Sequence, residues 1–229
     1  MDAGRSWRWR LPAGIMLIAG LATAIGWGYF LHWAPSALEY QFQGVDLSQT
    51  AGQVDWPVVH ADGADFAYVR ATYGAKGRDA AFERHWLALP AAQMRRGAYL
   101  EYSLCQPAVD QANNFNTVVP RSDDALPPVV FVDFSPDCTA RPPANVVVGE
   151  LARLLTMVEN HTGSPVLLKI SREFDVQYAI SNVMPRPIWA IGNFFRPTYA
   201  ARPWRMWQAN DRRRIDGIAQ PVHWDVVAP

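Results

Sequence analysis

The stretch 126–138, LPPVVFVDFSPDC, constrains the fold more strongly than any other part of the sequence. Its four apolar residues, 129–132, have two prolines before them and a Ser-Pro-Asp turn after them, which predicts a short strand covered on both faces. Such strands are typical of α/β folds, which carry their chemistry at the carboxyl ends of the strands. Asp133 stands at that end and is a candidate functional acid. The alternative is an Asp that caps the following turn through its own backbone.

Strand and helix patterns alternate along most of the chain. Strands are predicted at residues 42–46, 66–72, 97–104, 126–134, 166–171 and 188–191, and helical segments at 54–59, 80–94, 109–118 and 147–158. The last two predicted strands, 206–208 and 222–227, follow one another without a helix. This order is typical of a single α/β domain built as a (β/α) barrel whose last strands lack helices.

The N-terminal segment has the pattern of a membrane span. Residues 11–31 contain no charged side chain and are long enough to cross a bilayer as a helix, and three arginines precede them. By the positive-inside rule we expect a single-pass anchor in the inner (cytoplasmic) membrane, with the domain in the periplasm. The expected order is cytoplasmic tail, transmembrane anchor, linker and barrel domain, at residues 1–10, 11–33, 34–41 and 42–229. The alternative is a signal peptide cleaved near Ala22-Thr23-Ala24, which also exports the domain.

The charge balance and the scattered histidines exclude several kinds of partner. Lys+Arg and Asp+Glu both number 21, so no net field indicates nucleic acid. The five histidines lack metal-ligand spacing, and no glycine-rich phosphate loop follows any predicted strand. We therefore expect neither a metal nor a cofactor, and we expect the domain to act as a monomer.

The two cysteines, Cys105 and Cys138, fall at the ends of two consecutive predicted strands. In an exported protein, two thiols in such positions are more typical of a disulfide than of a metal site. The alternative is a pair of unpaired, buried thiols.

Five segments, in order, resemble the motifs of the glycoside hydrolase family 25 lysozymes, the muramidases of the Chalaropsis type. They are GVDLSQTAGQVDW at 44–56, FAYVRATYG at 66–74, GAYLEY at 97–102, LPPVVFVDF at 126–134 and RPWRMWQANDRRRIDGIAQPVHWDV at 202–226. The resemblance implies a flattened, irregular, TIM-like barrel with a cleft at the carboxyl ends of its strands. It also implies hydrolysis of the β-1,4 bond between N-acetylmuramic acid and N-acetylglucosamine in peptidoglycan.

The resemblance further implies where the catalytic acids lie. The family carries an Asp in its opening motif, an Asp and a Glu in a D-x-E motif, and an Asp in its closing V-D. Asp46 matches the first, and Asp133 falls on the Glu position with a side chain one methylene shorter. Phe131 and His223 stand in place of the other two acids, and Tyr73 replaces the Glu of the family's KATEG motif.

These departures leave two functions open. Glycosidic hydrolysis needs a protonated carboxyl for the leaving oxygen and a negative group to support the oxocarbenium-like transition state, and Asp46 with Asp133 supplies one such pair. Phe131 lies two residues before Asp133 on the same strand face, so its ring is expected to exclude water from that carboxyl, which suits a general acid. The shorter side chain of Asp133 is less suited to that role, since a displacement of a catalytic group by about 1 Å can cost on the order of 10²-fold in rate. The chain is either an active muramidase or a catalytically inactive module that binds glycan in the same cleft.

Glu101 is a candidate for the missing acid. The family motif carries Phe at this position and Asp where this chain has Phe131, so an aromatic and a carboxylate have changed places between neighbouring strands. Strands lie about 4.8 Å apart, and Glu101 could fill the space of the lost Asp if both side chains face the barrel interior. The alternative is that Glu101 faces the helix layer and pairs with a cation such as Arg70, because an unpaired buried Glu is costly.

Aromatic and polar side chains near the strand ends are candidate sugar contacts, since aromatic faces stack on pyranose rings and amides bond N-acetyl groups. For each aromatic residue the alternative is packing in the barrel core. The candidates are Tyr73, Tyr99, Tyr102, Phe131, Trp189, Trp207, Gln208 and His223.

Overall fold

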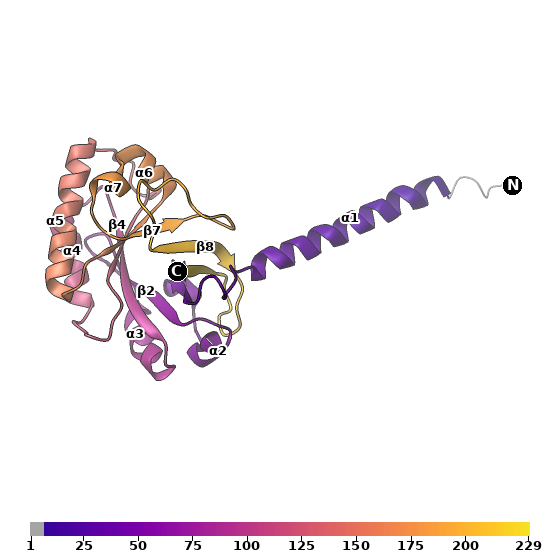
Figure 1. Cartoon of the computed structure of the whole chain (residues 1–229), viewed down its shortest axis with the longest axis horizontal. Coiled ribbons are helices and arrows are strands. Elements are labelled where there is room, and N and C mark those ends of the chain that lie inside the picture. The colour runs from indigo at the N-terminus through magenta and orange to yellow at the C-terminus, as the bar shows by residue number, and fades with distance from the viewer. Residues whose placement is uncertain (1–6) are drawn as a thin grey trace. The chain divides into compact units, whose positions relative to one another are not determined.

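The computed structural model describes residues 7–229, and the chain divides into two compact units, residues 1–33 and 34–229. The first unit contains helix α1, Trp7–His32 (Figure 1). Residues 1–6 of the predicted tail, and the side chains of residues 11–15 and 24–25 in the predicted anchor, lie outside the described part. Among the helices that are described, none combines the length and the apolar character that a membrane crossing requires, so the predicted anchor is not supported here.

The second unit is a closed barrel. Nine strands follow the order β1-β9-β8-β7-β6-β5-β4-β2-β3, and a pairing of β1 with β2 closes the ring and leaves β3 outside it. The strands are β1 Gln43–Leu47, β2 Phe66–Tyr73, β3 Gly77–Arg78, β4 Arg95–Tyr102, β5 Val129–Val132, β6 Leu167–Ile170, β7 Ile188–Ile191, β8 Met206–Arg213 and β9 Val222–Val227. Neighbours in the ring are parallel except that β9 runs antiparallel to β8 and to β1. The predicted α/β barrel is confirmed, and no helix separates β7, β8 and β9.

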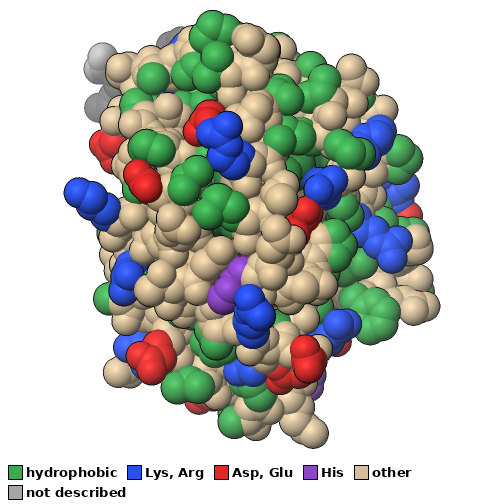
Figure 2. Space-filling view, turned by 90° about the vertical axis from the view of Figure 1, so that its left-hand side faces the viewer, with side chains coloured by type: hydrophobic (Ala, Val, Ile, Leu, Met, Phe, Trp, Pro, Cys, Tyr) green, Lys and Arg blue, Asp and Glu red, His purple; other side chains and the backbone are tan. Residues whose placement is uncertain are grey.

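Helices cover the outside of the barrel (Figure 1). They are η1 Gln49–Ala51, α2 Trp56–Ala61, α3 Phe82–Ala91, α4 Ala108–Val118, α5 Ala144–Thr162, α6 Arg172–Tyr178 and α7 Ile180–Val183. The apolar face predicted between residues 147 and 158 is buried in α5. Asp55 caps α2, as its position before Trp56-Pro57 predicts, by accepting a hydrogen bond from the Val58 N–H. Charged side chains of both signs are interspersed over the face in Figure 2, in keeping with the balanced composition.

Aromatic and aliphatic side chains fill the barrel interior. The buried cluster consists of Phe66, Tyr68, Tyr99, Val129, Leu167, Trp189 and Met206. Because side chains alternate along a strand, the residue two positions further on lies on the same inner face. On β4, β5 and β6 those next residues are Glu101, Phe131 and Lys169, which pair in register across the three strands. An apolar core therefore supports a layer of functional side chains at the carboxyl ends.

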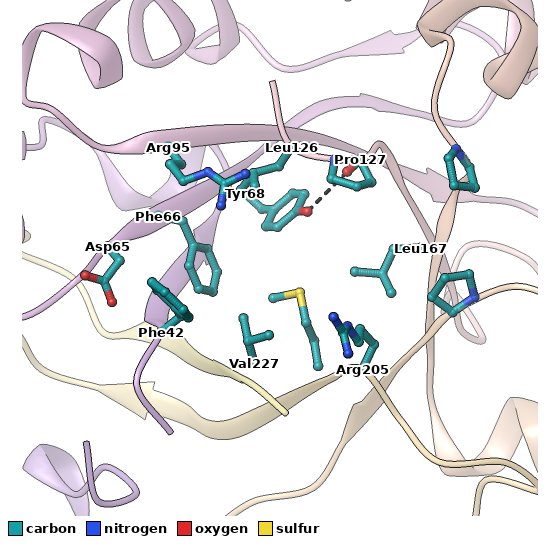
Figure 3. A pocket seen from close by; sticks show the side chains of 13 residues that line it. Phe42, Asp65, Phe66, Tyr68, Arg95, Leu126, Pro127, Leu167, Arg205 and Val227 are labelled. Atoms are coloured by element: carbon teal, nitrogen blue, oxygen red, sulfur yellow. Dashed lines mark hydrogen bonds between the residues drawn. The ribbon is translucent and has the colours of Figure 1, made fainter. Parts of the chain in front are cut away.

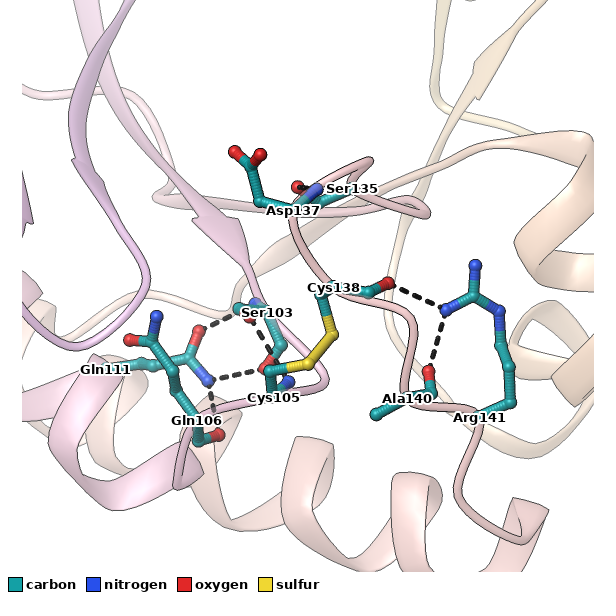
Figure 4. The surroundings of a disulfide bond; sticks show 9 residues. All are labelled: Ser103, Cys105, Gln106, Gln111, Ser135, Asp137, Cys138, Ala140 and Arg141. Carbon is teal, nitrogen blue, oxygen red and sulfur yellow. Dashed lines mark hydrogen bonds between the residues drawn. A yellow bond between two sulfur atoms is a disulfide. The ribbon is translucent and has the colours of Figure 1, made fainter.

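The predicted disulfide between Cys105 and Cys138 is confirmed, with 5.8 Å between the Cα atoms (Figure 4). It joins the segment after β4 to the loop after β5. Beside it, the Gln111 side chain accepts from the Ser103 N–H and donates to the Ser103 carbonyl, both at 2.8 Å. The disulfide thus ties the end of β4 to the loop after β5, and the Gln111 amide holds the segment after β4.

Replacing Cys105 and Cys138 together with Ser is expected to lower the free energy of unfolding by about 3 to 4 kcal/mol, because a bridge spanning a long loop restricts the unfolded chain. Urea unfolding of the variant and of the oxidised and reduced wild type measures the difference, and the reduced wild type serves as control. Two thiols open to alkylation in the denatured, unreduced wild type would contradict the bridge.

Candidate active site

Asp46 lies near the end of β1 with both carboxylate oxygens occupied. The Lys169 ammonium on β6 donates to Oδ2 at 2.6 Å, and His223 Nδ1 on β9 lies 3.0 Å from Oδ1. The Asp46 and Lys169 side chains are only 4% and 3% exposed. β1 is paired with β9 so that Asp46 and His223 face each other in register, whereas Lys169 reaches Asp46 from a strand that is not its neighbour. Asp46 and Lys169 thus form a buried ion pair at the carboxyl end of the barrel, and the more exposed His223 lies against it.

These contacts fix the charge state of Asp46. Burial by itself disfavours the ionised carboxyl, but the charges of Lys169 and His223 and their hydrogen bonds outweigh it and hold the pKa of Asp46 well below its usual range. Asp46 is therefore a carboxylate at neutral pH.

Lys169 is a site residue that the sequence analysis did not find. Its ammonium lies 4.4 Å from the ring centroid of Trp189 and 5.4 Å from that of Phe131, so two aromatic faces complete its surroundings. The signal was a lone charge within the apolar run VLLKIS, the same kind of signal that identified Glu101.

Asp225 is a second missed residue. It lies on β9, two residues after His223 on the same strand face, and it is fully buried. Its oxygens make no hydrogen bond of standard geometry within residues 7–229, and its polar neighbours include the Asp46 carboxyl and the Trp189 indole. Burial, followed by the nearby Asp46 carboxylate, raises the pKa of Asp225 well above its usual value, so Asp225 is a neutral acid beside an ionised one.

Glu101 faces the same pocket as Asp46. The pocket has a volume of about 140 Å³, and Asp46, Tyr99, Glu101 and His223 contribute to its lining. Arg70 Nη1 lies 3.1 Å from both oxygens of Glu101, and Arg70 Nε contacts the buried Asp79 at 3.0 Å. The structure thus places Glu101 in the pocket rather than against the helix layer, and it joins Glu101 to the predicted cation. Glu101 and Phe131 are register partners on the neighbouring strands β4 and β5.

Asp133 directly follows β5 and is half-buried. Its Oδ1 accepts the N–H of Phe134 at 2.8 Å, the local backbone bond that was the alternative to a functional role. Its other oxygen has no hydrogen bond within the described chain. Asp133 is not among the residues that line the pocket at Asp46.

The predicted sugar contacts fall into two groups. Tyr99 and His223 line the pocket, Phe131 is half-buried beside it, and Tyr73 is exposed with the Arg70 guanidinium 4.8 Å from its ring centroid. The other four side chains are buried: Trp189 in the barrel core, Trp207 against Tyr40 and Trp204, Tyr102 on the opposite face of β4 from Glu101, and Gln208 on β8. Packing in the barrel core, the alternative given above, describes Trp189, whereas Trp207 and Tyr102 are buried outside the barrel interior.

A larger cavity of about 410 Å³ lies at the opposite, amino end of the strands (Figure 3). Its wall is mainly apolar, and the Tyr68 hydroxyl donates to the Pro127 carbonyl there at 3.1 Å. Its one carboxylate, Asp65, already accepts the Gln43 N–H at 3.0 Å. Without a second acid this cavity is unsuited to glycosidic hydrolysis, and the amino face of such barrels serves stability rather than catalysis. Within the described residues, no group of three or more His, Cys, Asp and Glu is arranged to hold a metal ion.

Replacing Lys169 with Met is expected to lower the free energy of unfolding by about 3 to 5 kcal/mol at neutral pH, because Asp46 would remain buried without its cation. The lowered pKa of Asp46 means that its ionisation stabilises the fold above its unfolded pKa of about 3.9 and that this stability is lost as the pH falls through the folded value. The variant should therefore lose less stability than the wild type between neutral pH and pH values below about 4. Urea unfolding at a series of pH values measures both effects.

The chain offers a matched control in its other lysine, Lys76, which is exposed. Lys76→Met should leave the stability and its pH dependence close to those of the wild type. Equal stabilities for the two variants at neutral pH would contradict the structural role of Lys169.

Comparison with known proteins agrees with this fold. The model of the family "Glycosyl hydrolases family 25" matches residues 45–218. The protein YegX of Escherichia coli (strain K12) is 28% identical over 194 residues, which cover 82% of this chain and 70% of YegX. A family 25 glycosyl hydrolase from Bacillus anthracis superposes with a TM-score of 0.79 at 29% identity, covering 86% of this chain and 93% of that one. A bacterial lysozyme from Streptomyces coelicolor shares the fold, with a TM-score of 0.74 at 21% identity over 82% of this chain and 92% of its own. The chain belongs to glycosyl hydrolase family 25.

Proposed function

We propose that this chain hydrolyses the β-1,4 bond between N-acetylmuramic acid and N-acetylglucosamine in peptidoglycan, at the pocket lined by Asp46, Glu101 and His223. The observation that carries the proposal is the buried Asp46 carboxyl, held by Lys169 and His223 at the carboxyl end of a family 25 barrel. The names of several solved neighbours, among them the Streptomyces coelicolor lysozyme and a muramidase from Acremonium alcalophilum, support this substrate.

The residues divide the chemistry between them. A fixed, buried carboxylate at Asp46 stabilises positive charge that develops on the sugar ring in the transition state. Arg70 occupies both oxygens of Glu101, whereas Asp133 keeps one oxygen without a bond in the described structure. We therefore assign proton donation to the leaving oxygen to Asp133, and to Glu101 the support of developing positive charge.

A second function, glycan binding without hydrolysis, is favoured by specific observations. Phe131 occupies the position of an acid, and Lys169 offsets the charge of Asp46. Asp133 is bonded to its own backbone neighbour, Phe134. These features make Asp46 and Asp133 a weaker catalytic pair, but they leave the pocket able to bind a sugar.

Asp133→Asn is expected to slow the release of new reducing ends from purified peptidoglycan by about 10²-fold or more, since the leaving oxygen would lack its proton donor. Mass spectrometry of the digest of the full-length chain measures the release, and co-sedimentation with peptidoglycan measures binding, which should persist. Asp137→Asn, an exposed acid in the same loop, is the matched control and should keep full activity. Binding without release by the wild type would establish the binding module instead.

Glu101→Gln should also abolish release. This chain has Phe131 on β5 where the family motif has an Asp, and the substitution would also remove the carboxylate on β4. The double change Glu101→Phe with Phe131→Asp restores the family arrangement across the same register pair and should retain cleavage. Full activity in Glu101→Gln would show that Glu101 has only a structural role with Arg70.

We further propose that the domain acts as a monomer in the periplasm, held by residues 11–33 in the inner membrane. The uncharged run and the three preceding arginines support this topology. A reporter fused after Pro229 should be active only outside the cytoplasm, and activity confined to the cytoplasm would refute the topology. A mature chain that begins near Ile25 would indicate a cleaved signal peptide.

A further inference from the structure

Asp46 is poorly placed to exchange protons with a substrate in this arrangement. Lys169 holds one of its oxygens and His223 the other, at 2.6 and 3.0 Å, and the side chain is almost wholly buried. A carboxylate in such surroundings can orient a neighbour or stabilise charge, but with 4% of its side chain exposed it has little contact with water. Proton transfer on this side of the pocket needs another group.

His223 has the features of that group. Its side chain is 42% exposed and lines the pocket, in contrast to the buried Asp46 behind it. Because an ionised Asp46 accepts a hydrogen bond, Nδ1 of the neutral ring carries the hydrogen and Nε2 is left with a lone pair. Nε2 has no hydrogen bond among the described residues and is the nitrogen available to the pocket.

The other ionisable groups that face this site are unsuited to accept a proton. Burial, followed by the Asp46 and Glu101 carboxylates, raises the pKa of Tyr99 well above its usual value, so its hydroxyl keeps its hydrogen. Arg70 occupies both oxygens of Glu101. Asp225 is neutral and fully buried, and Lys169 is engaged by Asp46.

We propose that His223 Nε2 is the catalytic base that takes a proton from the attacking water, and that Asp46, besides supporting charge on the sugar ring, positions His223 for this step. The assignment rests on the proposed hydrolysis. As the water oxygen bonds to the anomeric carbon, the glycosidic carbon–oxygen bond breaks, and its electron pair goes to the leaving oxygen, which takes the Asp133 proton. The water proton goes to Nε2. The imidazolium is stabilised by Asp46, and solvent then carries a proton from His223 back to Asp133.

The test measures reducing-end release by the full-length chain with His223→Ala and His223→Asn. Asn can still donate a hydrogen bond to Asp46 but has no basic nitrogen, so both variants should lose about 100-fold or more in kcat. KM should change little. Added imidazole should restore part of the activity of His223→Ala, whose deleted ring leaves space, and should not rescue His223→Asn. His60→Ala, at an exposed histidine on α2, is the control and should keep wild-type activity.

The possible results separate this assignment from the proposed function. A wild type that releases no reducing ends overturns both. An active wild type with full activity in His223→Asn overturns the assignment alone, and so does a failure of imidazole to act on a folded His223→Ala. Thermal unfolding shows whether each variant is folded. If His223→Ala does not fold, His223→Asn decides the assignment. Retained activity in His223→Asn overturns it, and a loss of kcat in the folded protein supports it.

Discussion

The active end of this barrel depends on the buried ion pair between Lys169 and Asp46. The two residues are 123 positions apart in the sequence and lie on β6 and β1, so their contact exists only when the ring of strands is closed. Removing two charges from water is expensive, and the 2.6 Å contact offsets that cost only because both groups have further partners. Asp46 has His223, and Lys169 has the faces of Trp189 and Phe131. Closure of the barrel therefore brings together the charges that keep Asp46 ionised.

The Lys169–Asp46 pair also explains the environment of two nearby residues, Phe131 and Asp225. Phe131, which stands where the family motif has an acid, lines the space beside an ammonium, and an aromatic ring there is attracted to the cation. A carboxyl remains near Asp46, but it comes from β9 as the buried, neutral Asp225. Two carboxyls therefore lie close together near the centre of the barrel, one ionised and one neutral.

Much of the fold follows from local pattern, while the site depends on contacts that local pattern does not contain. Runs of alternating or continuous apolar residues predict the barrel strands, and the five apolar positions of α5 predict its buried face. Helices α6 and α7 span seven and four residues, too few for a helical period to stand out. Asp46, Glu101 and Asp133 could be found because each interrupts or ends a strand within a recognisable motif. Lys169 interrupts a strand in the same way, yet its partner lies across the barrel, and no spacing in the sequence connects the two. Asp225 was hidden because His223 holds the matching position in the closing motif.

The bridge between Cys105 and Cys138 connects the site to the conditions in which the chain matures. Glu101 lies four residues before Cys105, and Asp133 lies five residues before Cys138. The disulfide therefore joins the chain just after these two acids. Disulfides form in oxidising compartments and are reduced in the cytosol. In a reducing compartment, the loop that carries Asp133 lacks its only covalent tie to β4 among the described residues. Reduction of the bond therefore releases this loop from its tie to the end of β4.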